Sequence, residues 1–293
     1  MLASIHNEFL TLTVDTHGAE IHSVKNAKGE EMLWQGDPAV WPRRAPILFP
    51  WTGKQPTGAF TWQGKSYPAP QHGFARDLEH TLLKAEGDTL VMELKSGPET
   101  AERFPFAFTL TSRFRLEGQT VCQTLEVQNN SDGPMPFGIG FHPGFSVPFD
   151  TQHDTEDYEF RFDRAESPVC LSNRPNGLFS GSCSYALGRN RRAIPLTDHL
   201  FDNDSFCMTG LSSSTLGIYE KDTGRHITCR IAGYPYTLIW SAATPKCHFV
   251  CIEPWRSLPG EEGGSADWNE RAAAAVLAPG QSDETALRIE FAR

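Results

Sequence analysis

The chain has 293 residues, and its 26 Lys and Arg against 36 Asp and Glu give a formal net charge of −10. No stretch is rich in Lys and Arg, so the clustered positive charge that neutralises phosphates is missing and we expect no nucleic-acid partner. No run approaches the ~18 apolar residues of a membrane-spanning helix, and the first residues do not resemble a signal peptide, so we expect a cytoplasmic protein with no membrane partner.

The amino-acid composition excludes an intrinsically disordered chain, because 39% of the residues are hydrophobic and 11% are aromatic. Seven cysteines are present, an odd number, and none belongs to a Cys-x-x-Cys pair. We therefore expect reduced, buried thiols.

Alternation of apolar and polar residues predicts short strands and hairpins along most of the chain. In chain order the predicted strands are 9–14, 20–24, 60–62, 65–67, 89–94, 106–116, 120–127, 136–145, 158–162, 218–220, 226–231, 238–241, 247–252 and 287–291. Gln63-Gly64 and Glu117-Gly118 provide two of the turns.

Helical periodicity is almost absent. The best helix candidate is the Ala-rich segment 269–277, which Pro279-Gly280 would end. The polar segment 167–190 shows no clear period and is predicted to be an irregular surface excursion. The pattern indicates one all-β domain over residues 1–293, a sandwich of antiparallel strands larger than an immunoglobulin unit.

The segment 136–145 has an unusual strand composition. On a strand, Gly138, Gly140 and His142 share one face, which therefore carries no side chain before the imidazole. Glycine weakens a strand, and close approach of a ligand or of another part of the chain is one reason to accept that cost. A bulged strand with a structural histidine is the alternative.

The segment 247–255 is strongly apolar and contains one carboxylate, Glu253. Partial desolvation at the end of an apolar strand would raise the pKa of this acid toward the range useful for general base catalysis; an exposed strand-end acid is the alternative. We expect Pro254 to end the strand and Trp255 to offer a flat apolar surface. The alternation separates His248 from Cys247 and Cys251, so no Cys/His metal cluster is expected here.

A third segment, Gln71-His72-Gly73-Phe74-Ala75-Arg76-Asp77, adds a second histidine and an arginine. The chain has no His-x-His, no His-Glu-x-x-His, no Gly-x-Ser-x-Gly and no glycine-rich phosphate loop. We therefore expect no metal and no cofactor, and a site built on a carboxylate and an imidazole.

Five short motifs in a fixed order resemble the aldose 1-epimerase (galactose mutarotase) family, in particular its LacX-like branch. They are Pro46-Ile-Leu-Phe-Pro50 with Gly53, His72-Gly73-Phe74-Ala75-Arg76, Gly140-Phe141-His142-Pro143, Ile252-Glu253-Pro254-Trp255 and Leu277-Ala-Pro279-Gly280. The resemblance implies a galactose-mutarotase-like supersandwich and interconversion of the α and β anomers of a free hexose.

The resemblance also implies roles for individual residues. Glu253 would remove the proton from the C1 hydroxyl while His142 protonates the ring oxygen. The substrate-binding side chains would be His72, an arginine before Pro46 (Arg44 rather than Arg43), Arg76, Asp204 and Trp255.

Two alternatives to a free-hexose epimerase remain open. The close relatives that act on hexose 6-phosphates share the His-Gly-Phe-Ala-Arg run, so Arg44 and Arg76 also suit a phosphorylated sugar. A non-catalytic carbohydrate-binding module could use the same sandwich, although it would not need an acid/base pair. We expect a small-molecule sugar as the partner and a monomer or homodimer as the assembly.

Overall fold

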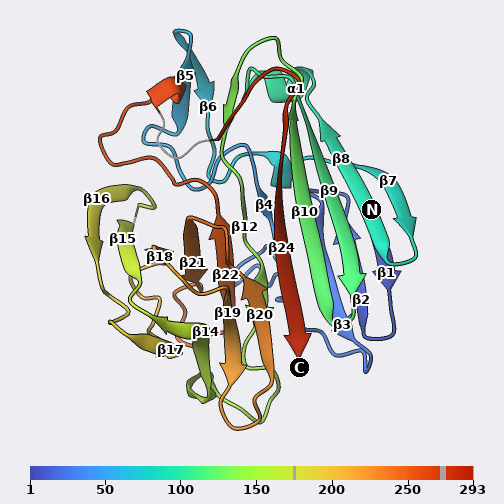
Figure 1. The fold of residues 1–293 in the computed structure, drawn as a ribbon, viewed down its shortest axis with the longest axis vertical. Helices are drawn as coiled ribbons and strands as arrows, with labels where there is room; N and C mark the ends of the chain where they lie inside the picture. Colours follow the sequence, from blue (N-terminus) through green and yellow to red (C-terminus); the bar gives the residue numbers. More distant parts are fainter. Residues whose placement is uncertain (174–175, 271–274, 293) are drawn as a thin grey trace.

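The computed structural model describes residues 1–173, 176–270 and 275–292, and its regular structure is almost entirely β (Figure 1). Within these ranges the helical elements are α1 (Pro98–Ala101) and the 3₁₀ turns η1 (Ala75–Asp77), η2 (Thr155–Asp157) and η3 (Trp268–Glu270). None of these helices is long and apolar enough to cross a membrane. The all-β expectation is confirmed.

The larger of two main sheets has nine antiparallel strands in the order β17-β14-β19-β20-β24-β10-β9-β8-β7. Their bounds are β7 (Thr81–Glu86), β8 (Thr89–Lys95), β9 (Phe108–Glu117), β10 (Thr120–Asn129), β14 (Tyr158–Glu166), β17 (Arg191–Pro195), β19 (Thr215–Glu220), β20 (His226–Arg230) and β24 (Ser282–Ala292). Buried and exposed residues alternate along β24, as expected where one face of an antiparallel sheet meets water.

The second main sheet has eight strands, in the order β16-β15-β18-β21-β22-β12-β4, with β13 also pairing with β22. Their bounds are β4 (Ile47–Leu48), β12 (Gly140–Phe141), β13 (Gly144–Ser146), β15 (Val169–Asn173), β16 (Phe179–Ser184), β18 (Phe206–Thr209), β21 (Tyr236–Trp240) and β22 (Phe249–Trp255). The predicted strand 136–145 is thus broken into short pieces, with His142 and Pro143 between β12 and β13.

Three small sheets complete the strand structure of the described residues. They contain β1 (Leu2–His6), β2 (Leu10–Asp15) and β3 (Glu20–Asn26); β5 (Ala59–Trp62) and β6 (Lys65–Pro68); and β11 (Met135–Phe137) and β23 (Ala275–Leu277).

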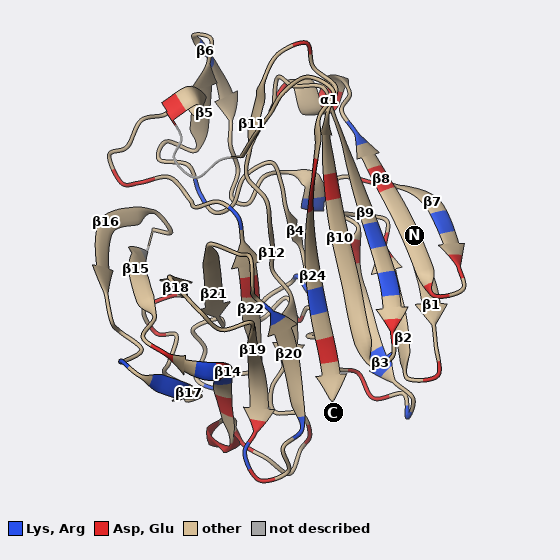
Figure 2. Ribbon diagram, viewed as in Figure 1, with Lys and Arg blue, Asp and Glu red and all other residues tan. Residues whose placement is uncertain are grey.

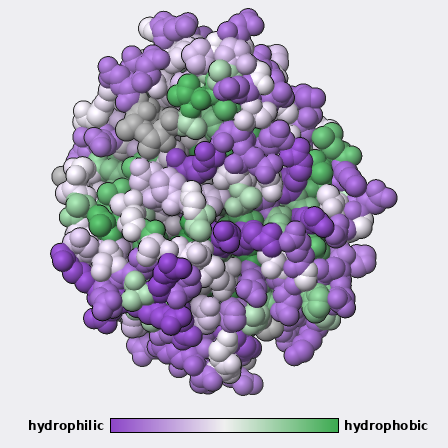
Figure 3. Space-filling model, viewed as in Figure 1, coloured by the Kyte–Doolittle hydropathy of each residue, from purple (hydrophilic) through white to green (hydrophobic). Residues whose placement is uncertain are grey.

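The main core contains apolar side chains from both large sheets. Ile47 and Val250 of the eight-stranded sheet belong to one contiguous buried cluster with Phe114 and Leu125 of the nine-stranded sheet. On the solvent face of the nine-stranded sheet, Lys and Arg are interspersed with Asp and Glu along β24, β10 and β9 (Figure 2). Hydrophilic side chains cover most of the face seen in Figure 3, and apolar side chains form small separate groups on it.

The predicted helix over 269–277 is wrong where the structure describes it. Ala275–Leu277 is the strand β23, paired with β11 so that Leu277 lies opposite Met135. Only Trp268–Glu270 forms a 3₁₀ turn, and residues 271–274 lie outside the described residues. Helix propensity amounts to only tenths of a kcal/mol per residue, and here strand pairing and the burial of Leu277 override it.

The segment 167–190 is also more regular than predicted. It contains β15 and β16, which pair with each other, and β15 pairs in turn with β18. The polar residues of β16 are exposed because it is the edge strand of the sheet, so the sequence shows no clear period.

All seven cysteines are free, and six of them are buried as expected; Cys183 on β16 is exposed.

Candidate active site

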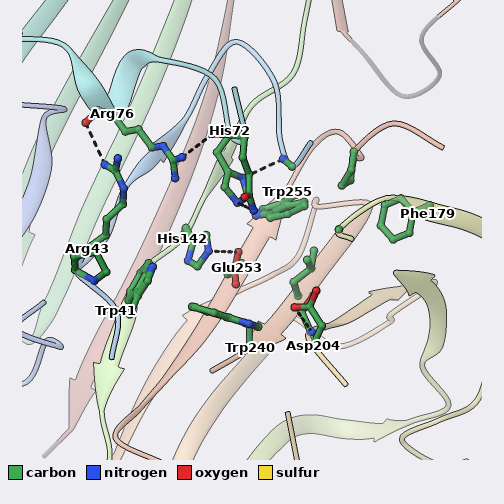
Figure 4. A pocket seen from close by; sticks show the side chains of 17 residues that line it. Trp41, Arg43, His72, Arg76, His142, Phe179, Asp204, Trp240, Glu253 and Trp255 are labelled. Atoms are coloured by element: carbon green, nitrogen blue, oxygen red, sulfur yellow. Dashed lines mark hydrogen bonds and ion pairs between the residues drawn. The ribbon is translucent and has the colours of Figure 1, made fainter. Parts of the chain in front are cut away.

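A cavity of about 360 Å³ opens on the face of the eight-stranded sheet that points away from the main core (Figure 4). Six of the seven expected site residues line it, namely His72, Arg76, His142, Asp204, Glu253 and Trp255. The seventh, Arg44, does not.

The centre of the cavity floor is a contact between His142 and Glu253. Nε2 of His142 lies 3.3 Å from Oε2 of Glu253. The contact follows from strand register: Gly140 pairs with Trp255 and Gly144 with Cys251, so His142 is placed opposite Glu253. Directly opposite residues on one face are close enough for their side chains to meet.

Glu253 is buried because β22 is covered on both faces. Val250 and Ile252 point into the main core, whereas Glu253 and Trp255 point toward the cavity. Contrary to expectation, Pro254 does not end the strand; it pairs with Thr237 of β21. On its other side β22 has no ladder partner between the pairings with β12 and β13, so a residue without an N–H is tolerated there. Glu253 is therefore inside the strand and 1% exposed.

The surroundings shift the two groups in opposite directions. Burial, reinforced by the negative charge of Asp204, raises the pKa of Glu253 well above its usual range. Burial, together with the positive charges of Arg76 and Arg43, lowers the pKa of His142 to about 3. Both shifts favour the uncharged forms, a protonated carboxyl on Glu253 beside a neutral imidazole on His142, so the pair can exchange one proton.

The glycines next to His142 make room for protein side chains. A Cβ on Gly140 would lie 2.7 Å from the ring of Trp255, and one on Gly138 would lie 2.3 Å from Oγ of Ser257. Of the two explanations for the glycines, the structure supports close approach. The groups that approach them are side chains of the same chain, not a ligand. Gly140 allows Trp255 to lie against the floor of the cavity.

His72 stands beside the pair with a fixed tautomer. The backbone N–H of Gly53 donates to its Nδ1 at 3.0 Å, so the ring hydrogen of the neutral imidazole must be on Nε2. Burial and the positive groups around it lower the pKa of His72 well below the usual value, which keeps the ring neutral. His72 can therefore donate one hydrogen bond from Nε2, either to the side-chain amide of Gln71, 3.2 Å away, or to a ligand oxygen in the cavity.

The arginines that line the cavity are not the pair expected from the sequence. Arg43 and Arg76 line the cavity, and Arg43 pairs with Asp77. Arg44 extends the other way, where Nη1 lies 3.0 Å from Nδ1 of His22 and its backbone N–H donates to Glu20. Arg43 therefore takes the place expected for Arg44, because neighbouring residues of this segment project to different sides, which the sequence alone does not resolve.

Asp204 and Trp255 complete the expected set. Asp204 has a left-handed backbone with φ of 77° and accepts a hydrogen bond from the N–H of Ser205 at 2.8 Å. The ring of Trp255 stands edge-on to that of His72, with centroids 5.6 Å apart. Asp204 thus supplies an acceptor on the side of the cavity away from the arginines, as Figure 4 shows.

Sequence reasoning missed two tryptophans that line the cavity, Trp41 and Trp240. Trp41 stacks on His142 with ring centroids 5.0 Å apart, and Trp240 stands edge-on to the same imidazole at 5.6 Å. Gly144 leaves the space for Trp41, because a Cβ there would lie 2.8 Å from its ring. The glycine after His142-Pro143 was a signal for a close neighbour, but it did not identify which one.

Two groups of described residues have the atoms to hold a metal ion. In the first, Asp150, His153 and Glu220, the guanidinium of Arg225 already contacts both carboxylates. The second consists of His142, Cys251 and Glu253, all buried, with ligand atoms within 4.8 Å of one another.

Comparison with known proteins gives a consistent result. Residues 1–289 match the family model described as aldose 1-epimerase. The chain belongs to the aldose 1-epimerase family. Among curated relatives, it is 28% identical to the plasmid-encoded protein LacX of Lactococcus lactis over 265 residues, 88% of each chain.

Solved structures of similar proteins share the whole fold of this family member. A galactose mutarotase related enzyme from Lactobacillus acidophilus superimposes with a TM-score of 0.93 at 28% identity, covering 99% of this chain and 97% of the other. A galactose mutarotase-like protein from Lactobacillus casei gives 0.92 at 28% identity, covering 99% and 100%. The expected galactose-mutarotase-like supersandwich is confirmed.

Proposed function

We propose that the protein is an aldose 1-epimerase that interconverts the α and β anomers of a free hexose. The observation that carries the proposal is the 3.3 Å contact between His142 and Glu253 on the floor of a cavity large enough for a sugar ring. Membership of the aldose 1-epimerase family supports an epimerase activity.

The chemistry requires one proton to leave the C1 hydroxyl and one to reach the ring oxygen. Both oxygens are bonded to C1, so two protein groups that lie close together can serve them. The pKa shifts favour the proton on Glu253, so in the proposed reaction it first passes to His142 over the 3.3 Å contact. Glu253 is then the carboxylate that takes the hydroxyl proton, and His142 gives its proton to the ring oxygen.

Ring opening then leaves an aldehyde at C1. Rotation about the C1–C2 bond presents the other face of the carbonyl, and the two proton transfers run in reverse to close the ring. His72 donates from Nε2 to a sugar oxygen, Asp204 accepts from a hydroxyl, and the apolar rings of Trp41, Trp240 and Trp255 exclude water.

Glu253→Gln tests the proposal because it preserves the shape of the side chain and removes its basicity. We expect anomer exchange, measured by magnetisation transfer, to fall by about 10²–10⁴, the usual contribution of general acid–base catalysis. His142→Asn should produce a loss of the same order, whereas sugar affinity should change far less in both variants.

Glu290→Gln, at an exposed position of β24, is the matched control and should retain wild-type exchange. Undiminished exchange in Glu253→Gln would end the proposal and leave the non-catalytic binding module as the better reading.

A hexose 6-phosphate is the second candidate substrate, because Arg43 and Arg76 both line the cavity. Asp77 lies against both guanidinium groups, at 3.9 Å from Nε of Arg76, and already offsets part of their charge. This compensation favours an uncharged sugar.

A panel of hexoses with and without a 6-phosphate would separate the two substrates. For a free-hexose enzyme, Arg43→Ala should change the KM for each hexose only a few-fold, and 6-phosphates should be poor substrates. If 6-phosphates turn over faster and Arg43→Ala raises KM for them alone, the phosphorylated substrate is correct. Arg44→Ala is the matched control, since Arg44 lies outside the cavity.

A further inference from the structure

Cys251 lies beneath the catalytic pair and has no part in the proposed reaction. It is on the same strand as Glu253, two residues earlier, and it is completely buried. Because residues two apart on a strand share a face, its thiol points to the side of the sheet that carries the cavity floor. The ligand atoms of Cys251, Glu253 and His142 lie within 4.8 Å of one another.

The three groups offer sulfur, nitrogen and oxygen, which is the donor set that Zn²⁺ prefers. Two ligands about 2.0–2.1 Å from a tetrahedral ion are roughly 3.3 Å apart, and Nε2 of His142 is 3.3 Å from Oε2 of Glu253. The sulfur, which is within 4.8 Å of both atoms, would have to move closer to complete a three-ligand site. The fourth position would face the cavity, where water or a sugar hydroxyl can enter.

Two features of the floor favour a cation there. Oε2 of Glu253 is buried and makes no hydrogen bond, although Nε2 of His142 lies 3.3 Å away. A divalent ion bound by one thiolate, one carboxylate and one neutral imidazole also leaves the buried site with no net charge, which avoids the cost of an uncompensated buried ion.

We propose that Cys251, His142 and Glu253 form a binding site for a thiophilic divalent cation such as Zn²⁺, and that the bound cation blocks the catalytic pair. The blocking part of this inference rests on the proposed function; the binding part does not. Binding displaces the thiol proton and the proton shared by the pair, so two protons are released to solvent for each ion bound. Catalysis itself needs no metal, and the cation acts as a reversible inhibitor that competes with the sugar.

Spectroscopy with Cd²⁺ or Co²⁺ tests the site without using activity. The wild-type protein should show a thiolate-to-metal charge-transfer band that saturates at one ion per chain, and a saturating aldose should weaken the binding. Cys251→Ala should lose the band, and its Zn²⁺ affinity should drop by at least about 10- to 100-fold, the loss typical of removing even an outer-shell partner. Cys251→Ser repeats the test with a side chain of nearly the original size.

Cys247→Ala is the matched control, because Cys247 is also buried but is outside the ligand group. It should keep the band and the Zn²⁺ affinity. Absence of a band in the wild type, or an undiminished band in Cys251→Ala, would overturn the site.

Activity then tests the inhibition. Zn²⁺ should inhibit wild-type anomer exchange and a chelator should restore it, whereas Cys251→Ala should need correspondingly more Zn²⁺. Binding of Zn²⁺ at Cys251 without any loss of exchange would overturn the blocking. A cysteine-dependent band together with full exchange in Glu253→Gln would remove the proposed function and leave the metal site standing.

Discussion

Trp41 covers the imidazole of His142 with the face of its indole. The same indole stacks on Phe249 at a centroid distance of 5.1 Å, so it is held between a core side chain and the imidazole of His142. This contact fixes the plane of the imidazole and keeps water away from it. In the proposed reaction we expect Trp41 to act as a positioning residue for His142.

Trp41→Ala should lower anomer exchange at saturating sugar by roughly 10- to 100-fold, because misplacing a catalytic group by about 1 Å can cost 10²-fold. Trp41→Phe retains a stacking face and should stay within a few-fold of wild type. Trp62→Ala is the control, because Trp62 packs on Phe106 and does not line the cavity. Wild-type exchange in Trp41→Ala would show that the stacking has no role in catalysis.

At the scale of elements, the segment that carries His72 depends on one glycine. Gly73 has φ of +76°, and a Cβ added there would lie 2.1 Å from the backbone oxygen of Phe49. The N–H groups of Phe74 and Ala75 donate to the same oxygen. Gly73 thus lets this segment approach the end of β4 and holds His72 at the cavity.

Gly73→Ala should lower the free energy of unfolding by more than the ~1–3 kcal/mol of a strained backbone conformation, because the clash with Phe49 adds to the strain. Gly58→Ala isolates the strain, since Gly58 has φ of +67° and nothing within 4 Å of an added Cβ. Chemical denaturation measures the free energy of unfolding of both variants, and the two losses relative to wild type are compared. Equal losses in the two would mean that the close approach to Phe49 contributes nothing.

At the scale of the whole molecule, buried histidines should make stability depend on pH. His142 titrates near 6.5 when the chain is unfolded and near 3 when it is folded, so only the unfolded state binds its proton between these values. The contribution of neutral His142 to the free energy of unfolding is therefore fully present above pH 6.5 and is lost as the pH falls toward 3. His72 shifts in the same direction. Glu253 has the opposite sign, because its raised pKa favours the folded state at low pH.

Denaturant unfolding at about pH 7.5 and about pH 5 should show a loss of stability on acidification that is roughly 2 kcal/mol larger in wild type than in His142→Asn. His199→Asn is the control, since the His199 side chain is 78% exposed, and it should lose as much stability as wild type. An identical pH dependence in wild type and His142→Asn would show that His142 does not stay neutral in the folded protein.

The alternation of apolar and polar residues was sufficient to predict most strands and their hairpins, because the apolar residues of a strand lie on the side that packs against the core. It failed for 269–277 and 167–190. The partner of β23 lies in β11, about 140 residues earlier in the chain, and β16 is an edge strand with little buried surface to impose a pattern.

The sequence by itself determined the all-β class and, through its motifs, the carboxyl and imidazole groups that line the cavity and most of the side chains around them. Only the tertiary structure decided how these groups meet. The register of β12 and β13 on β22 brings His142 to Glu253, and packing aims Arg43 rather than Arg44 at the cavity. The same register brings a ligand atom of His142 within 4.8 Å of the sulfur of Cys251. His248, which is nearer to Cys251 in the sequence, does not belong to this group. The physical reason is that side-chain periodicity is a local property of the chain, whereas strand pairing joins residues more than a hundred positions apart.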